Sequence, residues 1–263
     1  MITTSAQYQI INTNLARTKA LIEKDAVVKR ETDYYLANIK NVKTIDEFIK
    51  NDRLFKYAMK AYGLEDMAYG KALIKKLLTE GITDKKSMAN KMSNPLYKEF
   101  ATAFDFAGKG PEATAEASAT TEAVQRYVQI TLETNEGEKN QGIQLALYFK
   151  RKAPTIKTTM GLLADKAVLK FVQTTFGIPE GASKADLDVQ VRNLEKHLDV
   201  KDLQDPKKVD KLIQRFTAMW DMNNSTPETM SPILSLFGQT NDGAPGIGVD
   251  LMMSISKLRL GGM

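Results

Sequence analysis

Few side chains in this sequence belong to the types that usually carry out nucleophilic or metal chemistry. The 263 residues contain no cysteine and a single histidine, His197. Nucleophilic triads and most metal sites depend on these two residue types. His197 stands two positions after Glu195 on an expected helix, and residues two apart face different sides of a helix. We therefore expect His197 to be structural or on the surface, and we predict no catalytic, cofactor-binding or metal site.

Carboxylates could still act as a general acid and a general base. The adjacent pair Glu65 and Asp66 follows Gly63, where a helix is expected to end, so the pair is placed to complement the N-terminal dipole of the next helix. Asp105 and Asp221 occupy matching positions near the ends of two aromatic helices, and we expect both to bond the backbone. An enzyme is therefore the least favoured class of function.

Basic side chains form two stripes at helical spacing. The first stripe consists of Lys50, Arg53, Lys56 and Lys60, and the second consists of Lys207, Lys211 and Arg215. A solvated helix face explains such a stripe, and the alternative is a surface that recognises an acidic protein. The net charge of +5 comes entirely from residues 1–107, which hold 18 Lys and Arg against 13 Asp and Glu. This excess is too small to indicate nucleic-acid binding.

The composition predicts a folded protein without a membrane span. Apolar residues make up 43% and charged residues 26% of the chain, as in ordinary globular proteins. No run of about 18 uncharged apolar residues occurs, and the first residues have neither the basic nor the apolar region of a secretory signal. The absence of cysteine fits a reducing cytoplasm, and it fits equally a bacterial protein exported without disulfides.

The elements that must position these residues are helices, because apolar residues recur at spacings of three and four. The opening stripe consists of Tyr8, Ile11, Leu15, Thr18 and Ile22, and the next of Val28, Thr32, Tyr35, Ile39 and Val42. Thr44 and Glu47 form a capping-box pattern. Asn94-Pro95 and Asp205-Pro206 each supply an N-cap followed by a proline at the first helical position. We predict an all-α protein.

The middle of the chain contains two similar helical sequence patterns, which indicate an internal duplication. Residues 54–64 have a counterpart in 168–178, and residues 100–106 have one in 216–222. Aromatic residues match aromatic ones, aliphatic residues match aliphatic ones, and Gly63 matches Gly177. Because packing positions recur and reactive side chains do not, the pattern favours a scaffold over an active site.

Composition then suggests the domain boundaries. We expect a first helical unit at 1–107, a linker of small polar residues at 108–120, a second helical unit at 121–238, and a loop with a C-terminal helix at 239–263. In the last segment Leu251, Ile255 and Leu258 share one helical face. Together with the first basic stripe, this face is the candidate partner-binding surface, and it could pair with a helix of another copy or subunit.

Several longer motifs are spread over nearly the whole chain. They lie at residues 30–39, 51–67, 100–106, 145–154, 215–221 and 257–262. Examples are Leu-Ala-Leu-Tyr-Phe-Lys-Arg-Lys-Ala-Pro at 145–154 and Arg-Phe-Thr-Ala-Met-Trp-Asp at 215–221. These motifs resemble those of the domain-of-unknown-function family 1217. In addition, residues 12–18 are similar to the Asn-Leu-Ala-Asn run of axial rod and hook proteins, with Arg17 in place of the second Asn.

The resemblance implies an alphaproteobacterial protein, because family members occur there, are often encoded among flagellar genes and are sometimes labelled flagellar rod-like proteins. It supplies no reaction and no catalytic residue. We therefore expect a non-enzymatic structural or assembly protein of the flagellum, either cytoplasmic or exported without a cleavable signal, with other motility proteins as partners and with self-association possible. The alternative is a cytoplasmic binding or regulatory module that recognises an acidic partner through the basic first half.

Overall fold

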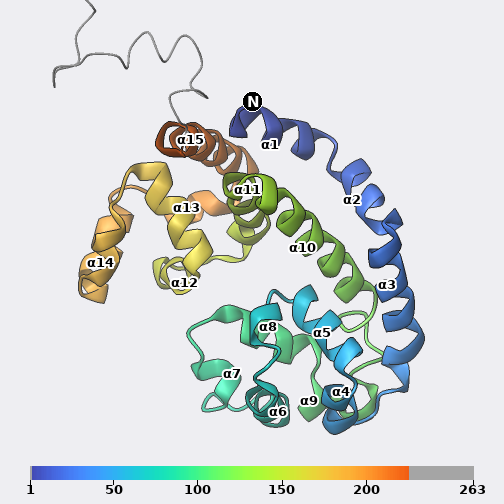
Figure 1. The fold of residues 1–263 in the computed structure, drawn as a ribbon. Helices are drawn as coiled ribbons and strands as arrows, with labels where there is room; N and C mark the ends of the chain where they lie inside the picture. Colours follow the sequence, from blue (N-terminus) through green and yellow to red (C-terminus); the bar gives the residue numbers. More distant parts are fainter. Residues whose placement is uncertain (1, 225–263) are drawn as a thin grey trace, which may run out of the picture. The chain divides into compact units, whose positions relative to one another are not determined.

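Every regular element in residues 2–224, the part of the chain that the computed structural model describes, is a helix (Figure 1). The α-helices are α1 (Thr4–Thr13), α2 (Leu15–Lys24), α3 (Ala26–Asn38), α4 (Ile45–Lys50), α5 (Asp52–Ala61), α6 (Lys71–Glu80), α7 (Met88–Lys91), α8 (Pro95–Ala103), α9 (Phe106–Lys109), α10 (Thr121–Lys139), α11 (Gln141–Lys152), α12 (Thr159–Ala164), α13 (Lys166–Phe176), α14 (Leu187–Glu195) and α15 (Pro206–Asn224). Short 3-10 turns connect several of them, namely η1 (Ile39–Asn41), η2 (Glu65–Met67), η3 (Gly110–Glu112), η4 (Ala153–Thr155), η5 (Glu180–Lys184) and η6 (Val200–Gln204). The all-α prediction is confirmed.

The opening helix differs from the single one expected over residues 8–22. The structure divides it at Asn14, whose side-chain amide donates to the Ile10 carbonyl oxygen at 2.9 Å. The following helix, α2, runs beside α10 and buries none of its side chains completely (Figure 1). Asp25 then caps α3 by accepting bonds from Val27 N and Val28 N at 2.9 and 3.1 Å. The break allows α1 and α2 to pack against different helices.

Aromatic rings fill the first core, which is built from α3 to α8, α9 and the start of α10. Phe48 has no exposed surface and stacks on Phe104 with ring centroids 5.0 Å apart. A second stack runs through Tyr35, Tyr57 and Tyr127, with centroid separations of 4.2 and 3.9 Å. Large rings bury about 150–250 Å² each, so such a cluster dominates the energetics of a core.

The segment 108–120, which composition predicted to be a linker, is part of the first core. Its completely buried side chains are Ala113, Thr114 and Ala119. Thr114 Oγ1 donates to the Val42 carbonyl at 2.7 Å, and the Tyr35 hydroxyl donates to the Ala119 carbonyl at 2.7 Å. The residues are small because the backbone passes close to the core, and not because the segment is a free connection.

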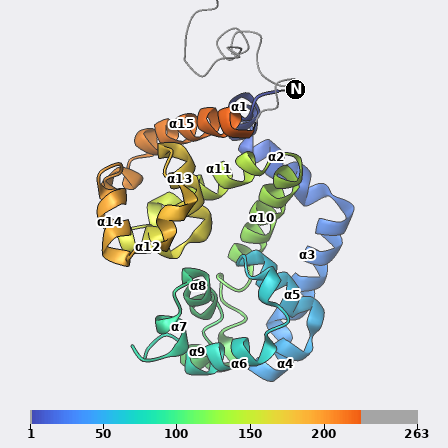
Figure 2. The ribbon, with the colours of Figure 1, turned by 60° about the vertical axis from the view of Figure 1, so that its left-hand side comes forward.

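The second core contains α11, α13 and α15, together with α1. Phe149 stacks on Phe171 at 3.7 Å and Phe171 stacks on Phe216 at 4.3 Å. Tyr8 and Ile11 of α1 are buried in this core. The first helix of the chain therefore packs with the second half of the sequence, which the expected boundary at residue 107 did not anticipate. Figure 2 shows α1 next to α15 and shows α10 running from the second core towards the first. Residues 2–220 form one compact unit.

The two cores repeat one order of elements. In the first, η1, α4 and α5 lead to Gly63, and in the second, η4, α12 and α13 lead to Gly177. Both glycines have a left-handed backbone, with φ of 71° and 65°. In each case the next residue closes the helix end, through Leu64 N to Met59 O and Ile178 N to Gln173 O, both at 2.8 Å. This pattern is a Schellman motif. The common order fits a duplication, which remains a prediction.

Other predicted helix starts are confirmed. Thr44 and Glu47 form both bonds of the capping box, and Asn94 caps α8 by accepting from Leu96 N at 2.9 Å. At the corresponding start of α15, Asp205 accepts from Lys207 N at 2.9 Å. These caps satisfy backbone donors that have no partner within the helix.

Candidate functional site

At the end of α11, charged side chains from four helices meet. Lys150, Arg151 and Lys152 are consecutive, and each residue of an α-helix is turned by about 100° from the last. The three cations therefore point in three directions. Their partners are Asp210 on α15, Glu133 on α10 and Glu99 on α8. We call Lys150, Arg151, Lys152 and these three carboxylates the α11 hub.

Lys152 is the most deeply buried cation of the hub. Its side chain is only 5% exposed, and Nζ contacts the Glu99 carboxylate. Glu99 also accepts a bond from Arg126 Nη1 at 3.1 Å, so one carboxylate joins α8 to both α10 and α11. Burial by itself raises the pKa of Glu99, but the charges and hydrogen bonds of Lys152 and Arg126 outweigh it and hold that pKa below its ordinary value. Glu99 is therefore ionised at neutral pH.

Arg151 binds Glu133 through two parallel hydrogen bonds. The Nε–Oε1 and Nη2–Oε2 distances are both 2.9 Å, and the Glu133 side chain is 4% exposed. Gln129 Nε2 donates to the same carboxylate at 2.8 Å. Bidentate pairs of this kind fix both the orientation and the position of the guanidinium group. They join α10 to α11 along their shared interface.

One turn earlier on α11, Tyr148 makes a further connection. Its hydroxyl donates to Asp165 Oδ2 at 2.6 Å, while Asp165 Oδ1 accepts from Ala167 N and Val168 N at the start of α13. Burial, followed by the neighbouring Asp165 carboxylate, raises the pKa of Tyr148. The hydroxyl consequently keeps its proton and remains a donor.

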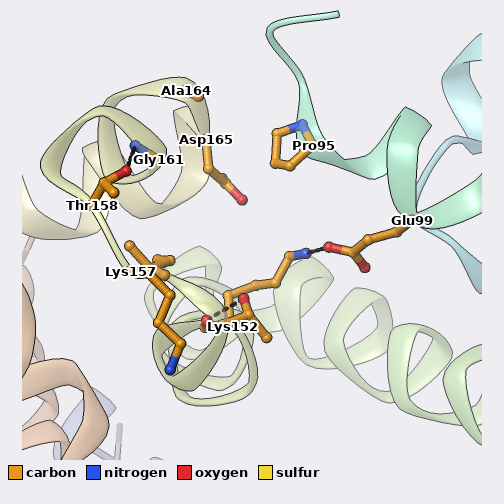
Figure 3. A pocket seen from close by; sticks show the side chains of 10 residues that line it. Pro95, Glu99, Lys152, Lys157, Thr158, Gly161, Ala164 and Asp165 are labelled. Atoms are coloured by element: carbon orange, nitrogen blue, oxygen red, sulfur yellow. Dashed lines mark hydrogen bonds and ion pairs between the residues drawn. The ribbon is translucent and has the colours of Figure 1, made fainter. Parts of the chain in front are cut away.

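A crevice of about 310 Å³ lies next to the Glu99 ion pair. Figure 3 shows Lys152 extending across it from α11 to Glu99, with Asp165 and Thr158 on the opposite wall. The Glu99 carboxylate binds two cations, and Asp165 caps a helix and accepts from Tyr148. Because its pKa is held below the ordinary value, Glu99 is not suited to act as a general acid at neutral pH. The arrangement is suited to holding elements together.

The described part of the chain contains neither a candidate metal site nor a candidate membrane span. Between residues 2 and 224 there is no cluster of three or more histidine, aspartate or glutamate side chains that could hold a metal ion. The same residues include no helix with the length and apolar character needed to cross a bilayer.

The first predicted basic stripe does not form one helix face. Lys50 ends α4, whereas the other three residues lie on α5, because Asn51 separates the two helices and caps the second. Arg53 pairs with Glu31 at 2.7 Å and lies 3.8 Å from the centre of the Tyr34 ring. Because the four cations lie on two helices and Arg53 is paired, the stripe offers a partner a smaller basic surface than the sequence predicted.

The remaining stripe residues are also paired, apart from Lys50. Lys56 contacts Asp52 at 3.2 Å and Lys60 contacts Glu65 at 3.9 Å. Lys50 is exposed, and no ion pair joins it to another residue of the described range. The predicted apolar face of Leu251, Ile255 and Leu258 lies outside the described residues.

Other candidate groups have local structural roles. The His197 ring is on the surface and stacks on Phe176 with centroids 5.4 Å apart, and Arg215 lies 4.8 Å from the same phenyl ring. Asp105 caps α9 by accepting from Gly108 N at 2.9 Å, as expected for a residue that bonds the backbone.

Sequence reasoning missed the hub although its three cations lie within the motif at 145–154. A search for stripes at spacings of three and four detects cations that share one face. Lys150, Arg151 and Lys152 instead cover different faces. The available signal was three adjacent cations on an otherwise apolar helix, since such a helix can be surrounded by acidic partners on several sides.

Comparison with known proteins places these features in a family. Residues 61–209, more than half of the chain, match the family described as "Protein of unknown function (DUF1217)". The chain is also similar to a protein of Agrobacterium tumefaciens whose X-ray crystal structure was determined by a structural genomics consortium. The two share 45% identity with a TM-score of 0.79, over 85% of this chain and 97% of that one. No curated protein matches the sequence. The chain therefore belongs to the DUF1217 family.

Proposed function

We propose that this protein is a non-enzymatic structural or assembly protein associated with the bacterial flagellum and active in motility. The starting point is the family resemblance, because members are often encoded among flagellar genes. The observation that carries the non-enzymatic part is the α11 hub. Its charged groups neutralise one another across α8, α10, α11 and α15, which supports a role in holding helices in place rather than in moving protons.

The proposed partners are other flagellar or motility proteins, or a second copy of the chain. Support comes from large apolar side chains on the first three helices, where Ile10, Leu21 and Val27 are 57%, 62% and 54% exposed. Apolar residues on an exposed helix can pack against a helix of another subunit. The protein would act in the cytoplasm on exported subunits, or in the flagellum itself.

Deletion of the gene tests the proposal. Loss of swimming, restored by the wild-type gene supplied in trans, is the expected result. Fractionation of the cells into filament, basal body and cytosol should then show the protein with flagellar components or bound to an exported subunit. Normal swimming together with no association with any flagellar fraction would overturn the proposal.

A cytoplasmic module that recognises an acidic partner is the second candidate. The observation in its favour is the excess of positive charge in residues 1–107, where Lys50 has no ion pair within the described range. Capture of partners through exposed charges weakens as salt shortens the Debye length from about 10 Å at 0.1 M to about 3 Å at 1 M. A pull-down that recovers the same partners at both salt concentrations would contradict this candidate.

A further inference from the structure

A second hollow of about 560 Å³ is lined by residues of α2, α10 and α11 and by Asn12 at the end of α1, and it shares only α11 with the crevice walls labelled in Figure 3. We call it the α2 groove. The charged side chains that line it are Lys19, Arg126, Lys150, Arg151 and Glu122. Four cations therefore face one carboxylate, although the first basic stripe predicted from the sequence lies elsewhere.

The ion pairs of Arg126 and Arg151 use only some of the N–H donors of these two groups. Glu99, Glu133 and Asp210, which bind three of the lining cations, are not part of the lining. A guanidinium group has five N–H donors. The pair of Arg151 with Glu133 uses Nε and Nη2, and that of Arg126 with Glu99 uses Nη1. The remaining donors of both groups are outside these pairs.

Two of the lining groups are held in position before any ligand arrives. Gln129 is 8% exposed and bonds Glu133, which also fixes Arg151. A donor set that is already ordered loses little side-chain entropy on binding, and this raises the affinity for a ligand of matching charge. The groove is thus a preorganised cationic site in the described part of the chain.

We propose that the α2 groove binds an acidic segment of a partner protein, with a carboxylate side chain among Lys19, Arg126 and Arg151. This inference rests on the proposed function, in which the protein assembles with other proteins. It names the kind of surface that the partner presents. It also moves the acidic-partner site from the α5 stripe, which consists of Arg53, Lys56 and Lys60, to a hollow with ordered donors. Three of the four cations in this hollow have ion pairs as well, and Lys19 is the fourth.

A peptide segment fits the groove better than a free acid. The volume of about 560 Å³ falls among pockets that hold drug-sized ligands, so a small dicarboxylate would leave most of it to water. Leu15 and Leu147 also line the groove, and they offer apolar contact that a bare carboxylate cannot use. A segment in which acidic and apolar residues alternate would satisfy both kinds of lining.

The test uses the purified full-length chain and a fluorescently labelled peptide of alternating Glu and Leu, with binding followed by anisotropy. Lys19→Glu should weaken binding about tenfold or more, because repulsion replaces attraction at the carboxylate. Lys19→Gln, which only removes the charge, should have a smaller effect of a few-fold. Circular dichroism checks that both variants are folded.

Two matched controls separate the groove from general charge effects. Lys50→Glu makes the same change of charge on the predicted basic stripe and should leave binding unchanged. Glu122→Gln removes the carboxylate of the lining and should strengthen binding a few-fold, whereas Glu138→Gln on the same helix should not change it.

Three results would overturn the proposal. They are no binding of the Glu-Leu peptide, an equal loss of binding with Lys19→Glu and Lys50→Glu, and competition by succinate as strong as that by unlabelled peptide. The last result would assign the groove to a free acid. Because the assay uses purified protein, peptide binding can be absent while the gene deletion abolishes swimming, and it can be present even when cells that lack the gene swim normally.

Discussion

The α5 stripe and the α11 hub are both runs of basic residues, but they differ in what their charges do. Lys56 and Lys60 pair with carboxylates four and five positions away, at the surface. Lys150, Arg151 and Lys152 pair with residues 60, 18 and 53 positions away in the sequence. The Lys56 pair lies within α5 and stabilises that helix slightly, and the Lys60 pair joins α5 to the adjoining turn η2. Arg53 of the stripe differs, since its partner Glu31 lies on α3. All three hub pairs hold separate helices together.

The largest change in the free energy of unfolding is expected from substitution of Glu99. Glu99→Ala leaves the buried Lys152 ammonium without a carboxylate, so we expect a loss of about 3–5 kcal/mol in the free energy of unfolding. Urea denaturation at pH 7 measures this. The double variant Glu99→Leu with Lys152→Met should recover most of the loss, because it removes both charges. A loss below about 1 kcal/mol for Glu99→Ala would mean that the pair does not hold the helices.

A smaller effect is expected at Arg151. Arg151→Lys keeps the charge but cannot form both parallel bonds to Glu133, so the free energy of unfolding should fall by about 1.5–3 kcal/mol. Arg53→Lys on α5 is the matched substitution at a more exposed pair, whose arginine is 40% exposed. Equal losses at the two positions, measured by urea denaturation, would contradict the distinction between hub and stripe.

Lower pH should remove the contribution that ionised Glu99 makes to the free energy of unfolding. Its pKa is lower in the folded protein than the ordinary value of 4.5, so the stabilisation is complete above about pH 4.5 and is lost as pH falls through the folded pKa. The difference in unfolding free energy between wild type and Glu99→Gln should therefore shrink from pH 7 to pH 3. A difference that stays constant over this range would show that ionisation of Glu99 does not contribute.

The smallest effect is expected on the stripe itself. The side chains of Lys56 and Asp52 are 66% and 55% exposed, and exposed pairs of this spacing contribute little to stability. Lys56→Ala should change the unfolding free energy less than any of the other substitutions, and 1 M salt should remove the difference. If Lys56→Ala lowered the unfolding free energy as much as Arg151→Lys does, the Lys56 pair would have to support the fold in the same way as the hub pairs.

Local features of the fold were predictable because their causes lie within a few residues. The capping box at Thr44 and the helix ends at Gly63 and Gly177 depend on hydrogen bonds that span at most five positions. The same is true of the caps at Asn94 and Asp205. Apolar periodicity also indicated a buried face, since Val28, Tyr35, Ile39 and Val42 of the second predicted stripe are all buried.

The candidate site was less predictable, because the same residue types suit several environments. Small polar residues at 108–120 are typical of a linker, yet here they pack where the backbone passes close to a core. The basic residues at 150–152 resemble an ordinary helix end until their acidic partners are known. The family resemblance located the motif at 145–154 but assigned no role to its charges.

The sequence by itself determined the helical class, several helix ends and the family, because propensity, capping and apolar spacing act over short distances. Only the tertiary structure decided that α1 packs with the second core and that Glu99 meets Lys152 across 53 positions of sequence. It also decided that the α2 groove, and not the α5 stripe, gathers cations beside ordered donors. Contacts between distant residues depend on how the helices pack, and that packing is set by the whole core at once.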